Sequence, residues 1–452
     1  MKTNKMTEGN PFRTIAVFAI PMICSNLFQQ LYNVIDTLIV GNRLGQDALA
    51  AVGSAGSITA VFVQLASGLA LGGSIVISQY FGGGKTEKIR LCATTSAVFS
   101  AVVGLISTII IWALAEPILL YVKTPVEIVE MGVSYLRFYF IGCVPIFVYN
   151  ALSSVYTALG NSKTPLKFLI ISSLLNVVLD LVFIVNFHAG VGGAALATAI
   201  SQFLAMLLAL RDIPKLLGNF PKQSGNTWFD GKLLFTMLRF ALPSAVQQSI
   251  VSVGSVVVQA TINSFGSAVI AGSAAAAKVV NLATAIPINY SNAYSAYVGQ
   301  NMGAGKQERI WPGLRSSILC CGTVSLGMTV VFELFAEPII RMFVSETDAD
   351  MAQVVEVGAE YIRVVGACLV VFASFMLIKA TFKGSGDMGW FILTTLLSFF
   401  IRLVVTVGFA GSFGVDVIWW GFCAGWIISL LFSIARYVQG GWKKKAIIKQ
   451  NT

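Results

Sequence analysis

The chain has 452 residues, of which 56% are hydrophobic and only 11% are charged, and its mean hydropathy is +0.81. A soluble domain carries about 25% charged residues, because it must cover its surface with them. This composition therefore excludes a water-soluble globule and indicates a chain in contact with lipid. The net charge of +10 does not indicate nucleic-acid binding, since basic residues of membrane proteins collect on cytoplasmic loops.

Long apolar segments recur along the whole chain. A helix needs about 20 mostly apolar residues to cross the hydrocarbon core, and a helix satisfies its own backbone hydrogen bonds in lipid. We therefore expect an all-α membrane protein with twelve transmembrane helices and no cleavable signal peptide. The predicted spans lie near residues 14–40, 48–80, 90–115, 126–158, 165–187, 191–211, 232–264, 268–300, 311–335, 350–382, 389–411 and 417–438.

Basic residues are shared unequally between the segments that join these spans. They are frequent on the side of the N-terminus, whereas the opposite segments carry only Arg43, Lys123 and Arg341. Because Lys and Arg are retained on the cytoplasmic side, both termini are expected in the cytoplasm. The predicted location is a bacterial-type cytoplasmic (inner) membrane.

The two halves of the chain resemble each other. QYFGGGKTEKI at 79–89 matches QNMGAGKQERI at 300–310, and AEPI recurs at 115–118 and 336–339. Six spans per half is an even number, so both halves enter the membrane from the same side. The repeat is therefore parallel, as in transporters whose halves are related by an axis along the membrane normal.

This repeat predicts the domain organisation. We expect two six-helix bundles related by a pseudo-two-fold axis along the membrane normal. The N-lobe is assigned to residues 1–211, a cytoplasmic linker to 212–231 and the C-lobe to 232–452. Such paired bundles are typical of transporters that work by alternating access.

Residues typical of enzymes and cofactor sites are sparse. The seven cysteines lie in apolar stretches without metal-ligand spacing, and the single histidine is His188. The segment GGGKT at 82–86 lacks the first glycine of a phosphate-binding loop. The aspartates within the spans lack the Gly-x-Gly-Asp context of intramembrane aspartyl proteases. We expect no enzymatic activity and no cofactor.

Two acidic residues, Asp36 and Asp180, lie inside predicted spans. An ionised carboxylate is costly within a bilayer, so such residues are functional candidates. Asn176 precedes Asp180 by four residues and shares its helical face. At 1.5 Å per residue, Asp36, Asp180 and Thr198 each lie roughly 6–11 Å from the outer end of their spans.

These side chains are therefore expected at one level of the N-lobe. Carboxylate, amide and hydroxyl oxygens suit a hard cation, and two close carboxylates would also share a proton. The site fits either sodium or protons as the coupling ion, and these residues would be the ligands if sodium is used. The alternative interpretation is a buried polar brace between helices.

Several motifs resemble the multidrug and toxic compound extrusion (MATE) family. They are AIPMICSNLFQQLYNVIDTLIVG with Pro21 and Asp36, LLNVVLD with Asn176 and Asp180, and GVGGAALAT ending at Thr198. The turns ALGNSKTP and FKGSGD also match. The resemblance implies a cation-coupling network of Asp36, Asn176, Asp180 and Thr198, and a bend of the first span at Pro21.

The C-lobe departs from one branch of this family, which carries acidic residues in the spans at 232–264 and 350–382. The first of these spans offers only Gln247, Gln248 and Gln259, and the second has no acid deeper than Glu360, so the sequence gives no support for a C-lobe cation site and leaves the question open. Arg402 stands at the repeat position of Asn176, which gives the second lobe the opposite polarity there. Arg402 is expected to pair with a carbonyl or another helix, or to line the cavity.

The predicted function is antiport: export of organic, cationic drugs or metabolites in exchange for sodium ions or protons by alternating access, in a lipid bilayer and as a monomer. The alternative is a flippase for lipid-linked precursors, of the same superfamily. Those substrates are anionic pyrophosphates and would require basic residues in the cavity, whereas Arg137 is the only basic residue that lies away from the ends of the N-lobe spans. The acidic N-lobe favours a cationic cargo.

Overall fold

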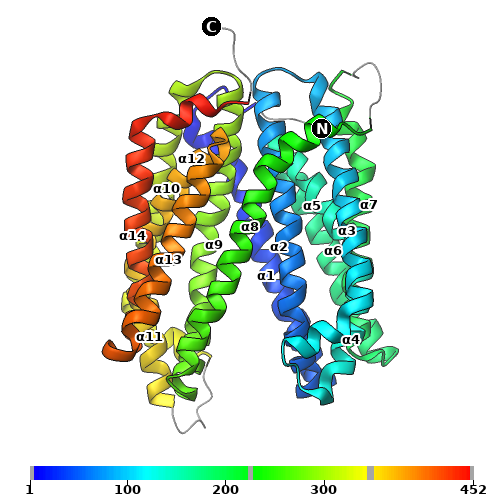
Figure 1. The fold of residues 1–452 in the computed structure, drawn as a ribbon, viewed down its shortest axis with the longest axis vertical. Helices are drawn as coiled ribbons and strands as arrows, with labels where there is room; N and C mark the ends of the chain where they lie inside the picture. Colours follow the sequence, from blue (N-terminus) through cyan, green and yellow to red (C-terminus); the bar gives the residue numbers. More distant parts are fainter. Residues whose placement is uncertain (1–4, 222–227, 344–350, 448–452) are drawn as a thin grey trace. The chain divides into compact units, whose positions relative to one another are not determined.

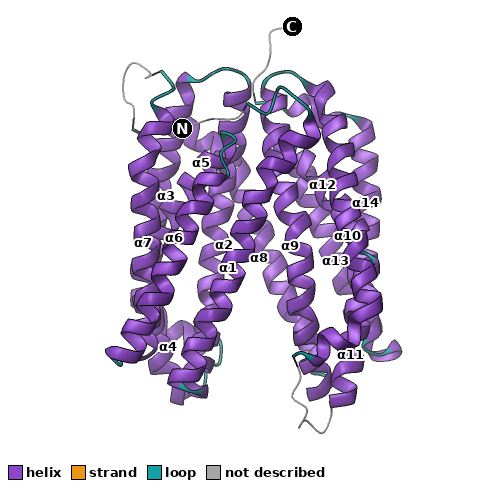
Figure 2. Ribbon diagram, turned by 180° about the vertical axis from the view of Figure 1, so that it is seen from behind, coloured by secondary structure: helices purple, strands orange, loops and turns teal. Residues whose placement is uncertain are grey.

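The computed structural model describes residues 5–221, 228–343 and 351–447, and none of these residues forms a β-strand. Within each unit, long helices lie side by side and loops join their ends (Figures 1 and 2). The elements are α1 (Pro11–Leu44), α2 (Gln46–Gly82), α3 (Glu87–Tyr121), α4 (Val126–Ile141), α5 (Cys143–Ala158), α6 (Lys163–Asp180), η1 (Leu181–Asn186), α7 (Gly190–Leu217), α8 (Gly231–Asn263), α9 (Ser267–Gly303), η2 (Gln307–Arg309), α10 (Ile310–Arg341), α11 (Met351–Ala367), α12 (Leu369–Ser385), α13 (Met388–Phe413), α14 (Asp416–Gln439) and η3 (Gly441–Lys445).

The prediction of an all-α membrane protein is confirmed. Ten helices of the described residues are long and apolar enough to cross a membrane, and two bent helix pairs bring the number to twelve if each pair is one span. The predicted linker at 212–231 differs in detail, because α7 continues to Leu217. Residues 222–227 of that linker lie outside the described residues.

The predicted spans at 126–158 and 350–382 are broken rather than continuous. The bend is 46° between α4 and α5 and 49° between α11 and α12. The breaks fall at Gly142 and Cys368, which are equivalent positions of the repeat. At Gly142 the cause is a close approach of α7, since an added Cβ would lie 2.8 Å from Ala199 Cα. Pro145 has no N–H to donate to Ile141 O, so the hydrogen bonding of α4 does not continue unbroken into α5.

Two compact units divide the chain. The first comprises Met1–Lys5 and Cys24–Ala245, and the second comprises Met6–Ile23 and Val246–Thr452. Each has its own apolar core, centred on α2, α4 and α7 in the first unit and on α9, α11 and α14 in the second. The boundaries between the units thus fall inside α1 and α8, just after Pro21 and Pro243.

The start of α8 is tightly built into the first unit. Gly72 of α2 packs directly against the backbone of α8, where an added Cβ would contact Met237 O and lie 2.8 Å from Ala241 Cβ. The Asp230 N–H, just before α8, donates to Thr95 Oγ1 at 3.1 Å. Close contact at small residues is the usual way in which membrane helices pack.

The start of the chain is built into the second unit in a similar way. The Met6 N–H donates to Gln300 Oε1 at 2.8 Å, and Arg309 Nη2 donates to Gly9 O at 2.8 Å. Ile15 and Ala19 of α1 are fully buried. The first turns of α1 are therefore fixed by polar and apolar contacts together.

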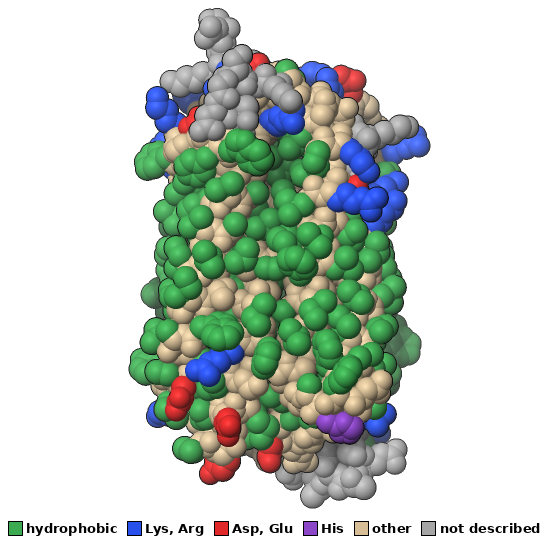
Figure 3. All heavy atoms as spheres, turned by 90° about the vertical axis from the view of Figure 1, so that its right-hand side faces the viewer, with side chains coloured by type: hydrophobic (Ala, Val, Ile, Leu, Met, Phe, Trp, Pro, Cys, Tyr) green, Lys and Arg blue, Asp and Glu red, His purple; other side chains and the backbone are tan. Residues whose placement is uncertain are grey.

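The surface of the first unit matches a membrane environment. Figure 3 shows hydrophobic side chains in a broad band over this face, with Lys and Arg gathered towards one end and acidic side chains towards the other. Apolar side chains of α3 are exposed along the helix, including Ile109 (60%) and Leu105 (53%). An apolar face of this extent is stable in lipid and would be unfavourable in water.

Candidate functional site

The last α-helical residue of α6 is Asp180, and a π-helical turn, η1, follows it directly. The side chain of Asp180 is fully buried and that of Asn176 is 1% exposed. With the Asn176 amide oriented to satisfy both of its neighbours, its nitrogen donates to Asp180 Oδ2 at 2.9 Å. Single π-turns in α-helices are frequent at functional sites, so α6 changes its winding where the acid is held.

Thr198 of α7 completes this polar group. Its backbone N–H and its Oγ1 lie 3.0 and 3.3 Å from the oxygen of the Asn176 amide, which accepts from them. Small residues allow α7 to lie close to its neighbours, because a Cβ on Gly193 would come within 3.1 Å of Phe183 Cβ in η1. The GVGGAALAT motif therefore brings Thr198 against α6.

Asp36 approaches the same group from α1. Its carboxyl group is close enough to that of Asp180 to interact with it as a direct hydrogen-bond partner. One oxygen of each acid, Asp36 Oδ1 and Asp180 Oδ1, is buried without a hydrogen-bond partner. The structure thus brings together the four residues predicted for cation coupling, in the first unit.

Three tyrosines surround these acids and were not predicted. The Tyr32 hydroxyl lies 3.4 Å from Thr198 Oγ1, while Tyr135 and Tyr139 of α4 stack with ring centroids 5.9 Å apart. All three lie within electrostatic range of Asp36. Tyr32 could have been predicted from the sequence, because it lies four residues before Asp36 and therefore on the same helical face. Nothing in the sequence pointed to the α4 pair.

Two chemical uses fit this arrangement. Facing carboxylates in a low-dielectric site cannot both stay ionised without a positive partner. A shared proton or a bound monovalent cation would remove the repulsion, and carboxylate, amide and hydroxyl oxygens are suitable ligands for a hard cation. The oxygens of the two acids that lack hydrogen-bond partners are the atoms available to hold the proton or the cation.

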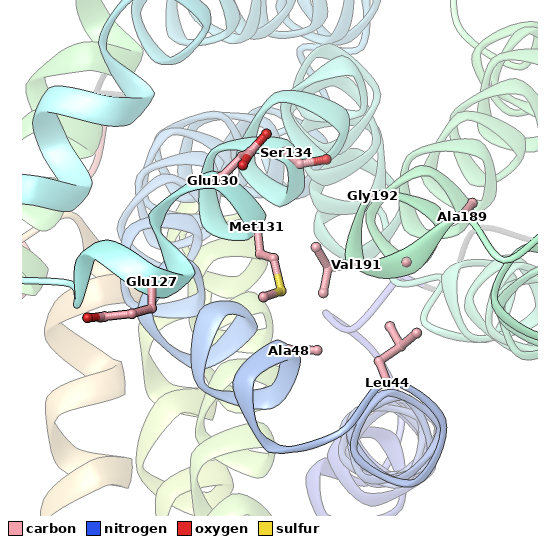
Figure 4. Close-up of a pocket in the computed structure, with 10 residues that line it drawn as sticks. Leu44, Ala48, Glu127, Glu130, Met131, Ser134, Ala189, Val191 and Gly192 are labelled. Carbon is pink, nitrogen blue, oxygen red and sulfur yellow. The ribbon is translucent and has the colours of Figure 1, made fainter.

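A cavity of about 380 Å³ lies at the end of the first unit near the site. Figure 4 shows Leu44, Ala48, Met131 and Val191 facing one another across it, with Glu127 directed away. Its lining comes from α1, α2, α4 and the start of α7. Since Asp36 lies eight residues before Leu44, it is roughly 12 Å from the cavity along α1.

The three glutamines of α8 that the sequence offered as polar candidates do not form a polar group comparable to that around Asp36 and Asp180. Gln247 is buried (4% exposed), whereas Gln248 and Gln259 are exposed. Gln259 Nε2 donates to Asn263 Oδ1 at 2.9 Å on its own helix. All three belong to the second unit and are not among the residues around Asp36 and Asp180.

Arg402 of α13 packs against another helix, through an aromatic ring. Its guanidinium carbon lies 3.5 Å from the ring centroid of Phe422 on α14. No acidic side chain of the described residues forms an ion pair with Arg402. Arg402 is only partly exposed, and a cation–π contact contributes about 0.5–2 kcal/mol. The ring alone does not balance this charge.

Comparisons with known proteins agree with the repeat and the fold. The family model described as MatE matches residues 21–182 and again residues 243–407. These two matches together cover more than half of the chain. Each begins at the equivalent proline, Pro21 or Pro243.

Curated relatives and solved structures match over nearly the whole length. The probable multidrug resistance protein YpnP of Bacillus subtilis is 27% identical and is covered over 98% of both chains. A MOP superfamily transporter from Pyrococcus furiosus, described as having a binding pocket of reverse polarity, aligns with a TM-score of 0.90 at 22% identity, over 98% of this chain and 100% of its own. An outward-facing MATE transporter of that superfamily gives a TM-score of 0.89 at 22% identity, over 98% and 99%.

Proposed function

Because the chain belongs to the MATE family of multidrug efflux transporters, we propose that it exports organic cations in exchange for sodium ions or protons by alternating access. The observation that carries this proposal is the pair of facing acids, Asp36 and Asp180, with one partnerless oxygen on each. Asp36, Asn176, Asp180 and Thr198 are assigned as the coupling residues.

Each of these residues has a proposed role. Asp36 and Asp180 bind the ion with their carboxylates, and Asn176 holds Asp180 in place through its amide N–H. Thr198 supplies a hydroxyl and orients the Asn176 amide through its own N–H. Binding of a cation removes the repulsion between the acids, so α1 can pack more closely against α6 and α7. No cofactor takes part.

Pro21 connects this event with the rest of α1. It lies fifteen residues before Asp36 and two residues before the end of the segment that belongs to the second unit. A proline removes one helical hydrogen bond and weakens the helix there. A change at Asp36 would therefore bend α1 near Pro21, narrowing the substrate cavity and releasing the cargo outward.

The proposed setting is a bacterial cytoplasmic membrane with both termini in the cytoplasm, and the proposed functional unit is a monomer. A cationic cargo is favoured because the buried charge of the first unit is acidic. The chain is a multi-pass membrane protein whose relatives include two proteins of Bacillus subtilis described as probable multidrug resistance proteins.

The direct test is efflux by proteoliposomes containing the purified protein, with a sodium gradient and a proton gradient imposed separately. Uptake of a fluorescent organic cation against its own gradient is expected with one of the two. Transport of the cation against its own gradient when neither a sodium nor a proton gradient is imposed would contradict the antiport proposal. Translocation of a lipid-linked precursor without transport of cations would favour the flippase alternative.

A further inference from the structure

The residues that form the cation site in the first unit have counterparts of opposite hydrogen-bonding character in the second. Arg402 and Thr406 of α13 stand 226 residues after Asn176 and Asp180 of α6, and Tyr361 stands at the same distance after Tyr135. The first unit leaves two buried acceptors, Asp36 Oδ1 and Asp180 Oδ1, without partners. At the equivalent place, the second unit leaves donors without partners.

Three such donors belong to this region. They are the buried atoms Arg402 Nε, Thr406 Oγ1 and Trp419 Nε1. Thr406 and Trp419 are both fully buried. A buried tryptophan N–H usually has an acceptor, so three unsatisfied donors around one helix pair call for an acceptor that the described residues do not supply.

Thr406 is unusual within its own helix. A helical threonine commonly donates to the carbonyl three or four residues earlier. Thr394 and Thr395 of α13 do so, to Trp390 O at 2.8 Å and Phe391 O at 2.9 Å. The Thr406 hydroxyl instead faces α14, where it lies 3.4 Å from the position of a Cβ on Gly421.

Aromatic rings connect Arg402 with Trp419, and Thr406 lies one helical turn after Arg402 on α13. Arg402 lies on Phe422, whose ring is 5.9 Å from that of Tyr361. Tyr361 in turn stacks on Trp419 with centroids 4.1 Å apart and an interplanar angle of 3°. The rings supply no formal charge to balance Arg402, which is partly exposed and forms no ion pair with any acid of the described residues.

We propose that Arg402, Thr406 and Trp419 form an anion-binding site in the second unit, which accepts a small monovalent anion such as chloride or a carboxylate group. One guanidinium balances one negative charge, and the apolar walls disfavour a dianion. The planar guanidinium suits a carboxylate in particular, because its donors match the two oxygens. This site goes beyond the proposed cation coupling and does not depend on it.

The test is thermal unfolding of the purified full-length protein in detergent. Sodium chloride and sodium acetate are titrated in separate series, with total sodium held constant by sodium sulfate. A ligand that binds only the folded state raises the unfolding midpoint as its concentration rises. We expect this rise for at least one monoanion. The salt that acts at the lower concentration shows whether the site prefers chloride or a carboxylate group.

Variants decide whether Arg402 is responsible. Arg402→Gln should abolish the anion-dependent rise and, without monoanions, should unfold at a midpoint no lower than that of the wild type. Thr406→Val, which keeps the charge, should weaken apparent anion affinity at least threefold. Arg363→Gln removes an exposed arginine of the same unit, 3.3 Å from Glu337, and should leave the rise intact.

Two results would overturn the proposal: no monoanion effect in the wild type, or the same effect in Arg402→Gln. A lower midpoint of Arg402→Gln with an unchanged anion effect would show that Arg402 only packs on Phe422. Asp36→Asn should retain the anion effect, so a failure of the cation-coupling proposal would not be mistaken for a failure of this one.

Discussion

The Asn176 amide donates to the Asp180 carboxylate at 2.9 Å, one helical turn away on α6, and its oxygen accepts from the Thr198 N–H at 3.0 Å on α7. The amide therefore links the acid to a neighbouring helix. This single side chain sets the position of one of the two facing carboxylates.

Removing either carboxylate should abolish gradient-driven transport. Asp36→Asn and Asp180→Asn keep the shape of the side chain but cannot bind a cation by charge, so efflux is expected to fall to the level of empty liposomes with normal expression. Asp47→Asn, which changes an exposed acid on α2, serves as the control. Wild-type efflux by both variants would refute the coupling assignment.

Removing the Asn176 amide should weaken ion binding without abolishing it. Asn176→Ala deletes a hydrogen bond to a charged group, worth about 1.5–3 kcal/mol, and about 1.4 kcal/mol corresponds to a factor of ten in affinity. The concentration of coupling ion for half-maximal efflux should rise by about tenfold or more. Asn289→Ala, a second-unit asparagine that donates to Ala285 O, should leave that concentration unchanged.

Pro21→Ala should slow turnover more than it weakens drug binding, because it restores a helical hydrogen bond and stiffens α1. Drug affinity is measured in detergent and the efflux rate in proteoliposomes, for this variant and for its repeat partner Pro243→Ala. A loss of rate in Pro243→Ala alone would contradict the assignment of α1 as the helix that moves.

The contact of α2 with the start of α8 should be sensitive to a single methyl group. Gly72→Ala places a Cβ against Met237 O and Ala241, and overpacking of this kind costs about 1–3 kcal/mol. The midpoint of thermal unfolding should fall. Gly53→Ala adds the same methyl to an exposed part of the same helix with no atom nearby, and should raise or preserve the midpoint.

Topology can be tested at two exposed positions. A cysteine at Asn219, just after α7, should react with a membrane-impermeant maleimide only in inside-out vesicles. A cysteine at Tyr121, which is 88% exposed at the end of α3, should react only in intact cells. The opposite pattern would invert the orientation derived from the basic residues.

Sequence patterns predicted the helical class and the approach of Asp36, Asn176, Asp180 and Thr198, because spans and helical faces follow from local periodicity. Other features depend on contacts between distant segments. The break at Gly142 lies where α7 approaches closely at Ala199, and the position of Tyr135 and Tyr139 beside the acids depends on how α4 packs against α2, α3 and α7. The π-turn after Asp180 likewise had no signature in the surrounding apolar residues.

The placement of Pro21 and Pro243 relative to the two units has a consequence for the origin of the chain. Each half contributes the start of its first helix to the opposite unit, so neither half on its own contains a complete bundle. A duplicated ancestor of half this length would have folded as a homodimer with exchanged N-terminal arms. Fragments separated between α7 and α8 should accordingly be unstable when produced singly and should restore a folded transporter only when produced together.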